Sequence, residues 1–354
     1  CDLHDQTMLL KVAIDREAPV THAVRNDAPE RKAMIQMLQE HARNAGGAQV
    51  IFVYEASGQG FGLYDELTEA GIQCHVLAPT RIARSSKHKK RKTDEQDAQQ
   101  LLDVLRAHVL AGNPLPTIWI PDATTRDDRE VVRMRLELAD KQTRIKAQVK
   151  GLLKRQGVRR PDSSKGWTTT YRRWLDGLAR GSRLSTGARQ TLASLLRQLR
   201  FLDQEIELAD AAVLALALSE RYSQRFYSLL TLKGVGTLTA MVFLTEIGVL
   251  QRFANRRQIA SYLGLVPSSS ESGAACDRKG RITRQGPYRV RKVLCQATWA
   301  RVRSDEEERK AYQRLVKKNP KKKKRAVVGP MGRVAGRRGP RGGEGGRRQG
   351  AGAR

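Results

Sequence analysis

The first third of the chain alternates between short apolar segments and amphipathic ones, and this order constrains the fold more than any other feature. Eight segments are predicted, in the order strand, strand, strand, helix, strand, helix, strand, helix: 1–2, 9–14, 21–24, 28–45, 49–54, 63–70, 74–77 and 94–109. An antiparallel start followed by strand–helix–strand units predicts a mixed sheet with helices on its faces. That order matches the ribonuclease H-like fold.

Acidic residues fall at the places where such a fold gathers carboxylates. Asp2 lies on the first strand, Glu55 ends an apolar strand, and Asp94 and Asp97 begin the last helix. Residues three apart share one helix face, and a segment rich in lysine and arginine precedes this pair. Such a pattern suits a divalent metal presented to a phosphodiester. A simpler interpretation, that Asp94 caps its helix and Asp97 favours the helix N-terminus, accounts for the pair but not for Glu55.

The charge balance predicts a polyanionic partner. The 354 residues carry a formal net charge of +30. Residues 317–354 hold 14 lysines and arginines and one glutamate, so the other residues retain about +17. A basic body of this size indicates nucleic acid, most simply DNA. The glycine- and arginine-rich segment after residue 317 is of low complexity, and we expect it to be disordered.

Cysteine usage and hydropathy set the expected compartment. The four cysteines form no CxxC pair, which predicts neither a zinc site nor a disulfide framework. The longest apolar run, residues 211–218, is too short to span a bilayer, and no signal peptide is visible. A reducing, cytoplasmic and nucleoid-associated setting without membrane contact is therefore expected.

The middle of the chain predicts long helices. Residues 124–156 and 184–218 carry apolar positions at helical spacing and suggest an antiparallel pair or coiled coil. Between them, Trp167, Tyr171 and Trp174 lie among basic residues. They could stack on nucleic-acid bases or pack a short helix, and the sequence does not choose between these uses.

Two further motifs lie in the last third. Residues 228–244 contain Gly234 and Gly236 around one valine, the signature of a helix-hairpin-helix that holds a DNA phosphate; a plain helix–helix turn is the alternative. Residues 253–265 predict a helix, 267–273 a serine-rich polar loop, 278–286 a basic segment, and 288–302 a final helix. A serine among arginines suits phosphoryl transfer, although composition alone favours a flexible linker. The residues predicted to contact DNA are Lys233, Gly234, Gly236, Arg278, Lys279, Arg281 and Arg284.

These motifs together resemble the insertion sequence 110 family of transposases over most of residues 1–316. The resemblance rests on 55–58, 92–98, 232–236, 262–267, 272–273 and 280–282. It implies four domains: a ribonuclease H-like (RuvC-like) catalytic domain at 1–122, a helical coiled-coil region at 123–225, a mostly helical transposase domain at 226–316 and a basic tail at 317–354.

The resemblance also implies chemistry and partners. It predicts a recombinase that cuts and rejoins DNA, with Mg²⁺ or Mn²⁺ held by Asp2, Glu55, Asp94 and Asp97. Its nucleophile maps to Ser272, with Ser270 as second choice. The family uses a structured guide (bridge) RNA and assembles as dimers and tetramers, and its active sites are shared between protomers.

Two other functions stay open on the sequence. A metal-dependent nuclease of the Holliday-junction resolvase kind would use the carboxylates and the hairpin but leave the serine loop unexplained. A non-catalytic basic protein that binds nucleic acid would need none of the acidic residues. We also expect Asp2 to have almost no backbone pairing, because it lies beside the first residue of the sequence, and misplaced groups lose catalytic power steeply.

Overall fold

The computed structural model describes residues 1–82, 93–161, 166–270, 278–318 and 320, without the side chains of residues 269, 270, 278 and 279. It divides into two compact units, residues 1–120 and 121–354. The first is a mixed α/β unit and the second is mostly helical. Three predictions lie outside the described residues: the structure around Ser272, the basic segment before Asp94, and the disorder of nearly all of the tail.

The first unit contains two strand ladders that meet at the start of the chain. Strands β1 (Asp2–Leu3), β2 (Thr7–Val12) and β3 (Val20–Arg25) are antiparallel neighbours, while β4 (Ile51–Glu55) and β5 (Gln73–Leu77) are parallel. The backbone nitrogen of Cys1 donates to the carbonyl oxygen of Val53 at 2.8 Å, which joins β1 to β4. Asp2 pairs with Leu9, so the expectation that it lacks backbone pairing is wrong.

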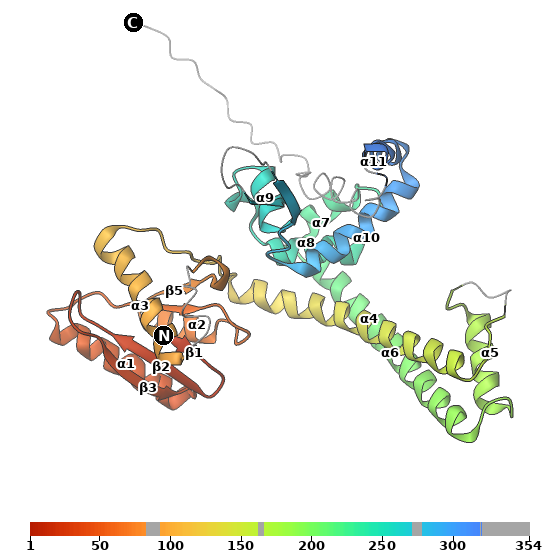
Figure 1. Cartoon of the computed structure of the whole chain (residues 1–354), viewed down its shortest axis with the longest axis horizontal. Helices are drawn as coiled ribbons and strands as arrows, with labels where there is room; N and C mark the ends of the chain where they lie inside the picture. Colours follow the sequence, from red (N-terminus) through yellow and green to blue (C-terminus); the bar gives the residue numbers. More distant parts are fainter. Residues whose placement is uncertain (83–92, 162–165, 271–277, 319, 321–354) are drawn as a thin grey trace, which may run out of the picture. The chain divides into compact units, whose positions relative to one another are not determined.

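Helices cover both faces of these strands (Figure 1). Helices α1 (Ala28–Asn44) and α2 (Gly62–Glu69) share one apolar core with Phe52 and Tyr54 of β4. Helix α3 (Asp94–Ala111) shares the other core with Val53 of β4. Side chains alternate across a strand, so β4 is buried on both faces, as its apolar sequence predicted. The predicted helices and parallel strands are confirmed, and β2 begins and ends two residues earlier than predicted.

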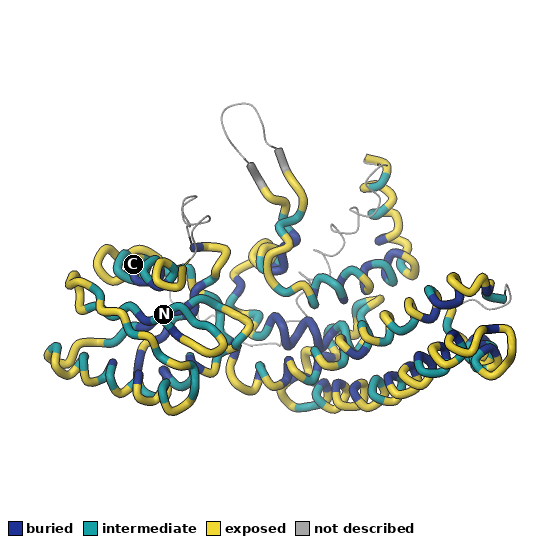
Figure 2. The backbone as a smooth tube through the Cα atoms, turned by 60° about the horizontal axis from the view of Figure 1, so that its bottom comes forward, coloured by how far each residue is buried: buried dark blue, intermediate teal, exposed yellow. Residues whose placement is uncertain are grey.

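The second unit is built around two long helices, α4 (Ala123–Arg155) and α6 (Thr186–Leu218). They run antiparallel, because Arg135 pairs with Asp210 and Gln142 with Asp203, so that one number rises as the other falls. Buried and exposed residues alternate along both helices (Figure 2), which confirms the predicted amphipathic pair. Helix α5 (Thr169–Arg180) packs against α6 at one end of the pair and shares an apolar core with both helices.

The other end of α4 and α6 contacts a group of shorter elements. These are α7 (Ser223–Leu230), α8 (Thr237–Ile247), η3 (Leu250–Arg252), α9 (Arg256–Tyr262), β6 (Pro267–Ser270), β7 (Arg278–Ile282), α10 (Tyr288–Ser304) and α11 (Glu306–Lys318). The predicted helix 253–265 is shorter, because the Asn255 side chain accepts a hydrogen bond from the Gln258 backbone and caps α9 there.

Residues 267–270 of the serine-rich segment and residues 278–282 of the basic segment form strands rather than loops. Strands β6 and β7 form an antiparallel hairpin in which Ser270 pairs with Arg278. The hairpin is tight, since a Cβ at Gly280 would lie 2.3 Å from the Ser268 hydroxyl oxygen. Serine, glycine and charged residues are poor strand formers, and for that reason no strand was predicted here.

Candidate metal centre

Two aspartates and a histidine converge at one edge of the first unit. Asp2, His4 and Asp94 each offer a ligand atom, and these atoms all lie within 4.8 Å of one another. The His4 Nε2 atom is 3.1 Å from Asp2 Oδ2 and 3.4 Å from Asp94 Oδ1. Asp2 is 14% exposed in its side chain and Asp94 61%, so the group opens to solvent. Carboxylate and imidazole atoms at this spacing can share one divalent cation.

Backbone hydrogen bonds fix the segment that carries His4. The residue lies in the turn between β1 and β2, where its N–H donates to the Thr7 carbonyl at 2.9 Å. Its own carbonyl accepts from the Asn26 side chain at 2.7 Å, and Asn26 also donates to Gln59. Three separate segments thus hold this turn in place. The position of His4 is therefore set by the fold and not by its side chain alone.

Helix α3 presents Asp94 without using it as a cap. The Thr93 hydroxyl accepts from the Gln96 backbone and makes Thr93 the N-cap, so the interpretation of Asp94 as the cap is wrong. Glu95 turns toward β2 and pairs with Lys11 at 2.8 Å. Asp94 is left as the first helical residue, with its carboxylate toward His4.

The other two predicted ligands lie nearby in the fold but outside this group. Glu55 is the last residue of β4, and Asp97 lies one turn into α3, which packs against β1, β2 and β4. Within the described residues, the group of atoms within 4.8 Å consists of Asp2, His4 and Asp94. His4 was not predicted as a ligand, although its spacing of two from Asp2 places both residues on one side of an extended segment.

The site borders a solvent-filled hollow of about 540 Å³. It is lined by the turn after β1 and by the glycine-containing turn after β4, residues 3–7 and 57–59. Gln59 spans it, donating to the Asp5 carboxylate at 2.9 Å. A phosphodiester could approach His4 from this side without displacing an apolar side chain.

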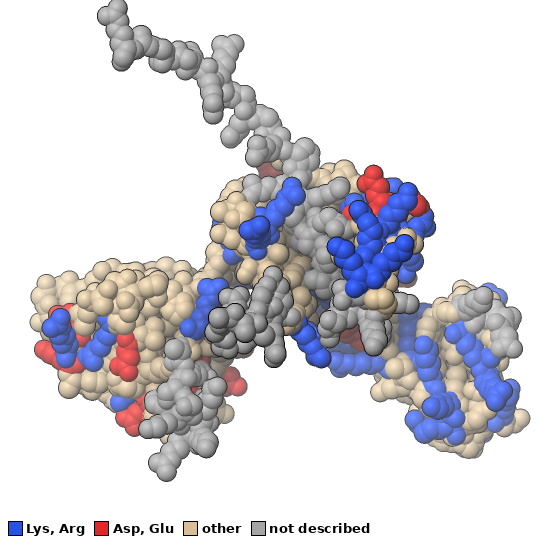
Figure 3. All heavy atoms as spheres, turned by 45° about the horizontal axis from the view of Figure 1, so that its top comes forward, with Lys and Arg blue, Asp and Glu red and all other residues tan. Residues whose placement is uncertain are grey.

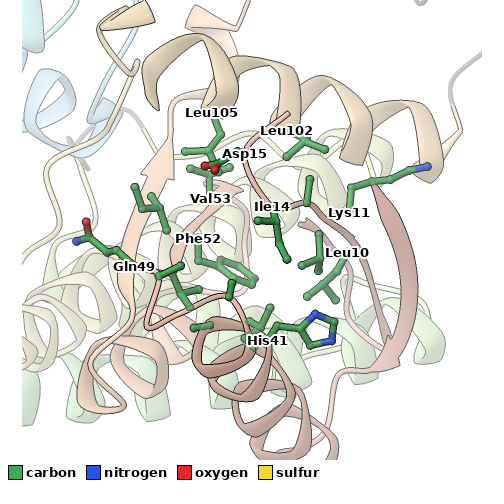
Figure 4. Close-up of a pocket in the computed structure, with 18 of the residues that line it drawn as sticks. Leu10, Lys11, Ile14, Asp15, His41, Gln49, Phe52, Val53, Leu102 and Leu105 are labelled. Atoms are coloured by element: carbon green, nitrogen blue, oxygen red, sulfur yellow. The ribbon is translucent and has the colours of Figure 1, made fainter. Parts of the chain in front are cut away.

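A second hollow in this unit has different chemistry (Figure 4). It measures about 220 Å³ and lies among α1, β2, β4 and α3, with Leu10, Phe52 and Leu102 in its wall. Asp15 is the carboxylate among its lining residues. Its other possible ligands, His41 and Cys1, do not form a close group with Asp15 among the described residues, so the candidate centre is the Asp2 group.

The predicted DNA-contacting glycines of the second unit differ in what surrounds them. Gly234 has φ +84°, and a Cβ there would lie 2.5 Å from the Ala297 carbonyl oxygen of α10. Gly236 is the N-cap of α8 with open space around it, and Lys233 is 65% exposed, 3.9 Å from Asp305. All three residues are exposed, but Gly234 also has a packing role, because the side of its Cα that a Cβ would occupy faces α10.

The remaining predicted contacts lie on or after the β6–β7 hairpin. Arg278 and Lys279 begin β7, and Arg281 continues it as an exposed residue. Arg284 is exposed and has φ +58°, and its N–H donates to the Gly264 carbonyl. Ser270 ends β6, and Ser272 lies outside the described residues. None of the helices in the described part of the chain has the length and apolarity that a bilayer crossing requires.

The sequence matches two families of mobile-element proteins. Residues 2–157 match a family described as a DEDD transposase of IS110 type, and residues 227–313 match one described as the transposase IS116/IS110/IS902 family. The candidate metal group lies within the first match, and the α7–α8 turn, the β6–β7 hairpin and α10 lie within the second.

Relatives in two genera show the same likeness. Two putative transposases of Sinorhizobium fredii are each 30% identical; one alignment covers 77% of this chain and 63% of the relative, the other 73% and 67%. The transposase for insertion sequence element IS1533 of Leptospira borgpetersenii is 27% identical over 59% of this chain and 58% of its own length. The chain thus spans about two thirds or less of the length of these relatives, and it belongs to the IS110 family of transposases.

Proposed function

We propose that the protein cuts and rejoins DNA, using the Asp2 group to hold a divalent cation. The observation that carries this proposal is the convergence of Asp2 and His4, which are two residues apart, with Asp94 of α3, which is remote from them along the chain. Two carboxylates this close to each other and to an imidazole repel each other unless a cation or a proton lies between them. Family membership supplies the substrate class, since transposases act on DNA.

The donor set fits Mg²⁺ or Mn²⁺. Carboxylate oxygens suit both ions, and the imidazole nitrogen is the more familiar ligand of transition metals, which favours Mn²⁺ at this group. When bound, the cation would neutralise charge on a phosphate and lower the pKa of an attacking hydroxyl. We propose that Glu55 and Asp97 complete the site when substrate binds. Asp97 lies on α3, the helix that carries Asp94, and Glu55 ends β4, against which α3 packs.

The protein's own residues would divide the remaining tasks. Asp2 and Asp94 would orient the scissile phosphate through the cation, and His4, whose Nε2 faces both carboxylates, would hold the same cation in place. We further propose, from the family resemblance, that the Ser272 hydroxyl attacks the phosphorus and loses its proton. One P–O bond to deoxyribose breaks, the sugar oxygen leaves as a free hydroxyl, and the phosphate stays on the protein as a phosphoserine link. The first unit would be ribonuclease H-like, and a guide RNA and a second protomer would join the reaction.

A metal-binding experiment tests the site. Mn²⁺ binding to the full chain is followed by electron paramagnetic resonance for the wild type, Asp94→Asn and Glu95→Gln. The last is a matched control, because Glu95 is an adjacent acidic residue paired with Lys11 instead. We expect Asp94→Asn to weaken binding about tenfold or more and Glu95→Gln to change it little. Equal losses in both variants would refute the assignment.

A trapping experiment tests the serine. The wild type, Ser272→Ala and Ser270→Ala are incubated with DNA that carries the element's end, and covalent protein–DNA adducts are resolved under denaturing conditions. We expect the adduct to vanish only in Ser272→Ala. Cleavage to free ends with no adduct in any variant would instead support the resolvase-like nuclease.

A further inference from the structure

The end of the second unit that carries α5 concentrates positive charge. Residues 141–200, which comprise the last part of α4, all of α5 and the first part of α6, hold 16 lysines and arginines but only two acidic residues, both aspartates. On the face drawn in Figure 3, lysine and arginine side chains gather over this end. We call residues 141–200 the distal hairpin.

Two described acidic groups at the distal hairpin are already engaged in holding it together. Asp176 of α5 pairs with Arg200 of α6, and Asp203, just beyond the hairpin on α6, pairs with Arg172. Hydrogen bonds from Arg172 and Gln142 offset the effect of burial and leave the pKa of Asp203 below its ordinary value. With these two carboxylates engaged, the other cations of the hairpin far outnumber any acidic residues that could neutralise them.

A hollow of about 510 Å³ lies within this surface at the end of α4. It is lined by Lys150, Lys154, Arg159 and Arg160, together with apolar atoms and Tyr171. The Arg160 guanidinium lies over the Tyr171 ring at 4.3 Å from its centroid, which fixes its direction. Lysine and arginine in the last turn of α4 also favour the helix dipole, but Arg159 and Arg160 lie beyond the helix, so the dipole does not explain them.

The aromatic residues decide which part of a nucleic acid this surface fits. Tyr171 is buried, and Trp167 and Trp174 pack against the apolar core that α4, α5 and α6 share. The ring of Trp174 stacks on Tyr171, and Trp167 meets the same ring edge to face. Packing rather than base stacking is thus the role the structure gives them. The aromatic ring that lines the hollow, Tyr171, is thus buried, and cations without an exposed ring beside them suit the phosphates of a duplex, not the bases of a single strand.

We propose that the distal hairpin binds the backbone of duplex DNA, independently of sequence, through the hollow lined by Lys150, Lys154 and Arg159. This inference rests on the proposed function for the choice of DNA as the polyanion. The internal apolar core and the α5–α6 ion pairs hold the cations in place before binding, so little ordering cost is expected when DNA docks.

The test compares two triple variants of the full chain. Lys150→Gln with Lys154→Gln and Arg159→Gln removes three charges from the hollow, and Lys32→Gln with Arg43→Gln and Arg81→Gln removes three exposed charges from the first unit. Binding to a fluorescent 30-base-pair DNA of arbitrary sequence is measured by anisotropy in EDTA, over a range of salt concentrations. EDTA removes divalent cations, so the metal site is inactive in this experiment whether or not the proposed chemistry is correct.

The expected result is a selective loss. Each phosphate contact contributes about 0.9 to the slope of log affinity against log salt, so the hollow variant should lose about 2 to 3 from that slope and bind at least tenfold more weakly. The control should keep the wild-type slope. Wild-type affinity in the hollow variant would overturn the proposal. So would an RNA duplex whose binding depends on the hollow while DNA binding does not, because the surface would then serve RNA.

Discussion

Replacing Gly234 separates the packing role of the α7–α8 turn from its predicted contact with DNA. The turn was predicted as a DNA-binding hairpin in which both glycines expose amides to a phosphate. In the structure the Cα of Gly234 lies against α10, with φ +84° and the Ala297 carbonyl oxygen 2.5 Å from where a Cβ would lie, although the residue is exposed. Gly236, two residues on, has φ −103° and nothing within 4 Å of a Cβ.

The magnitude follows from two separate costs. Alanine in the left-handed region costs on the order of 1 kcal/mol, and forcing a methyl group into backbone atoms costs roughly 1–3 kcal/mol more. We therefore expect Gly234→Ala to destabilise the second unit by about 3 kcal/mol, which lowers its Tm by about 6–12 °C for a unit of this size. Gly236→Ala should cost only about 0.5 kcal/mol, because alanine is a poorer N-cap than glycine.

Differential scanning calorimetry of the full chain measures both variants, and DNA binding is measured at a temperature where each remains folded. Gly234→Ala should lose stability and, once folded, keep most of its affinity, because Lys233 and the α8 N-terminus stay exposed. Equal melting temperatures for Gly234→Ala and Gly236→Ala would refute the packing argument. Loss of DNA binding without loss of stability would restore the original interpretation of this glycine.

Three other predictions concern buried groups. Glu246, 7% exposed, accepts two hydrogen bonds from Arg133, so Glu246→Ala should cost about 3–5 kcal/mol by leaving buried arginine charge uncompensated, as measured by urea unfolding. Burial raises the pKa of Asp203, but the hydrogen bonds and charge of Arg172, the hydrogen bond of Gln142 and the charge of Lys146 together bring it below its ordinary value. The stability that Asp203 contributes is therefore present above the unfolded-state pKa near 3.8 and is lost as pH falls through the folded value. The loss of Tm in Arg172→Gln should therefore shrink in acid, below about pH 4, and a loss that stays constant with pH would contradict this. Burial raises the pKa of the Cys74 thiol to about 12, so thiol reagents at pH 8 should modify Cys74 only after unfolding, as peptide mapping can show.

Strong periodicity made most of the architecture predictable. The two long helices and β4 carry apolar residues at spacings that few other structures satisfy, and all three are found as predicted. The β6–β7 hairpin was missed, because its pairing depends on the close approach of Gly280 to Ser268 and on no hydrophobic pattern. The short α9 shows the same limit, since a single capping side chain, Asn255, sets where it begins.

The candidate site was predictable in part for a related reason. The sequence placed Asp2 and Asp94 at the right elements, because strand ends and helix starts follow from the order of segments. It did not yield His4, whose role depends on a turn held by Asn26 from the end of β3. That hydrogen bond joins residues 22 positions apart, a distance at which local patterns carry no information. A histidine two residues after a candidate aspartate is the signal that could have found it.

The uneven distribution of charge bears on how a carboxylate site and a polyanionic substrate can occur in one chain. Residues 1–120 hold 14 lysines and arginines against 15 acidic residues, whereas the distal hairpin holds 16 against two. Clustered carboxylates repel a phosphate until a cation offsets them, so the first unit has little long-range attraction for DNA. Affinity must then come from elsewhere, and the distal hairpin has the charge to supply it. It follows that DNA binding should survive in EDTA and fall steeply with salt, while strand cleavage should require the metal at every salt concentration.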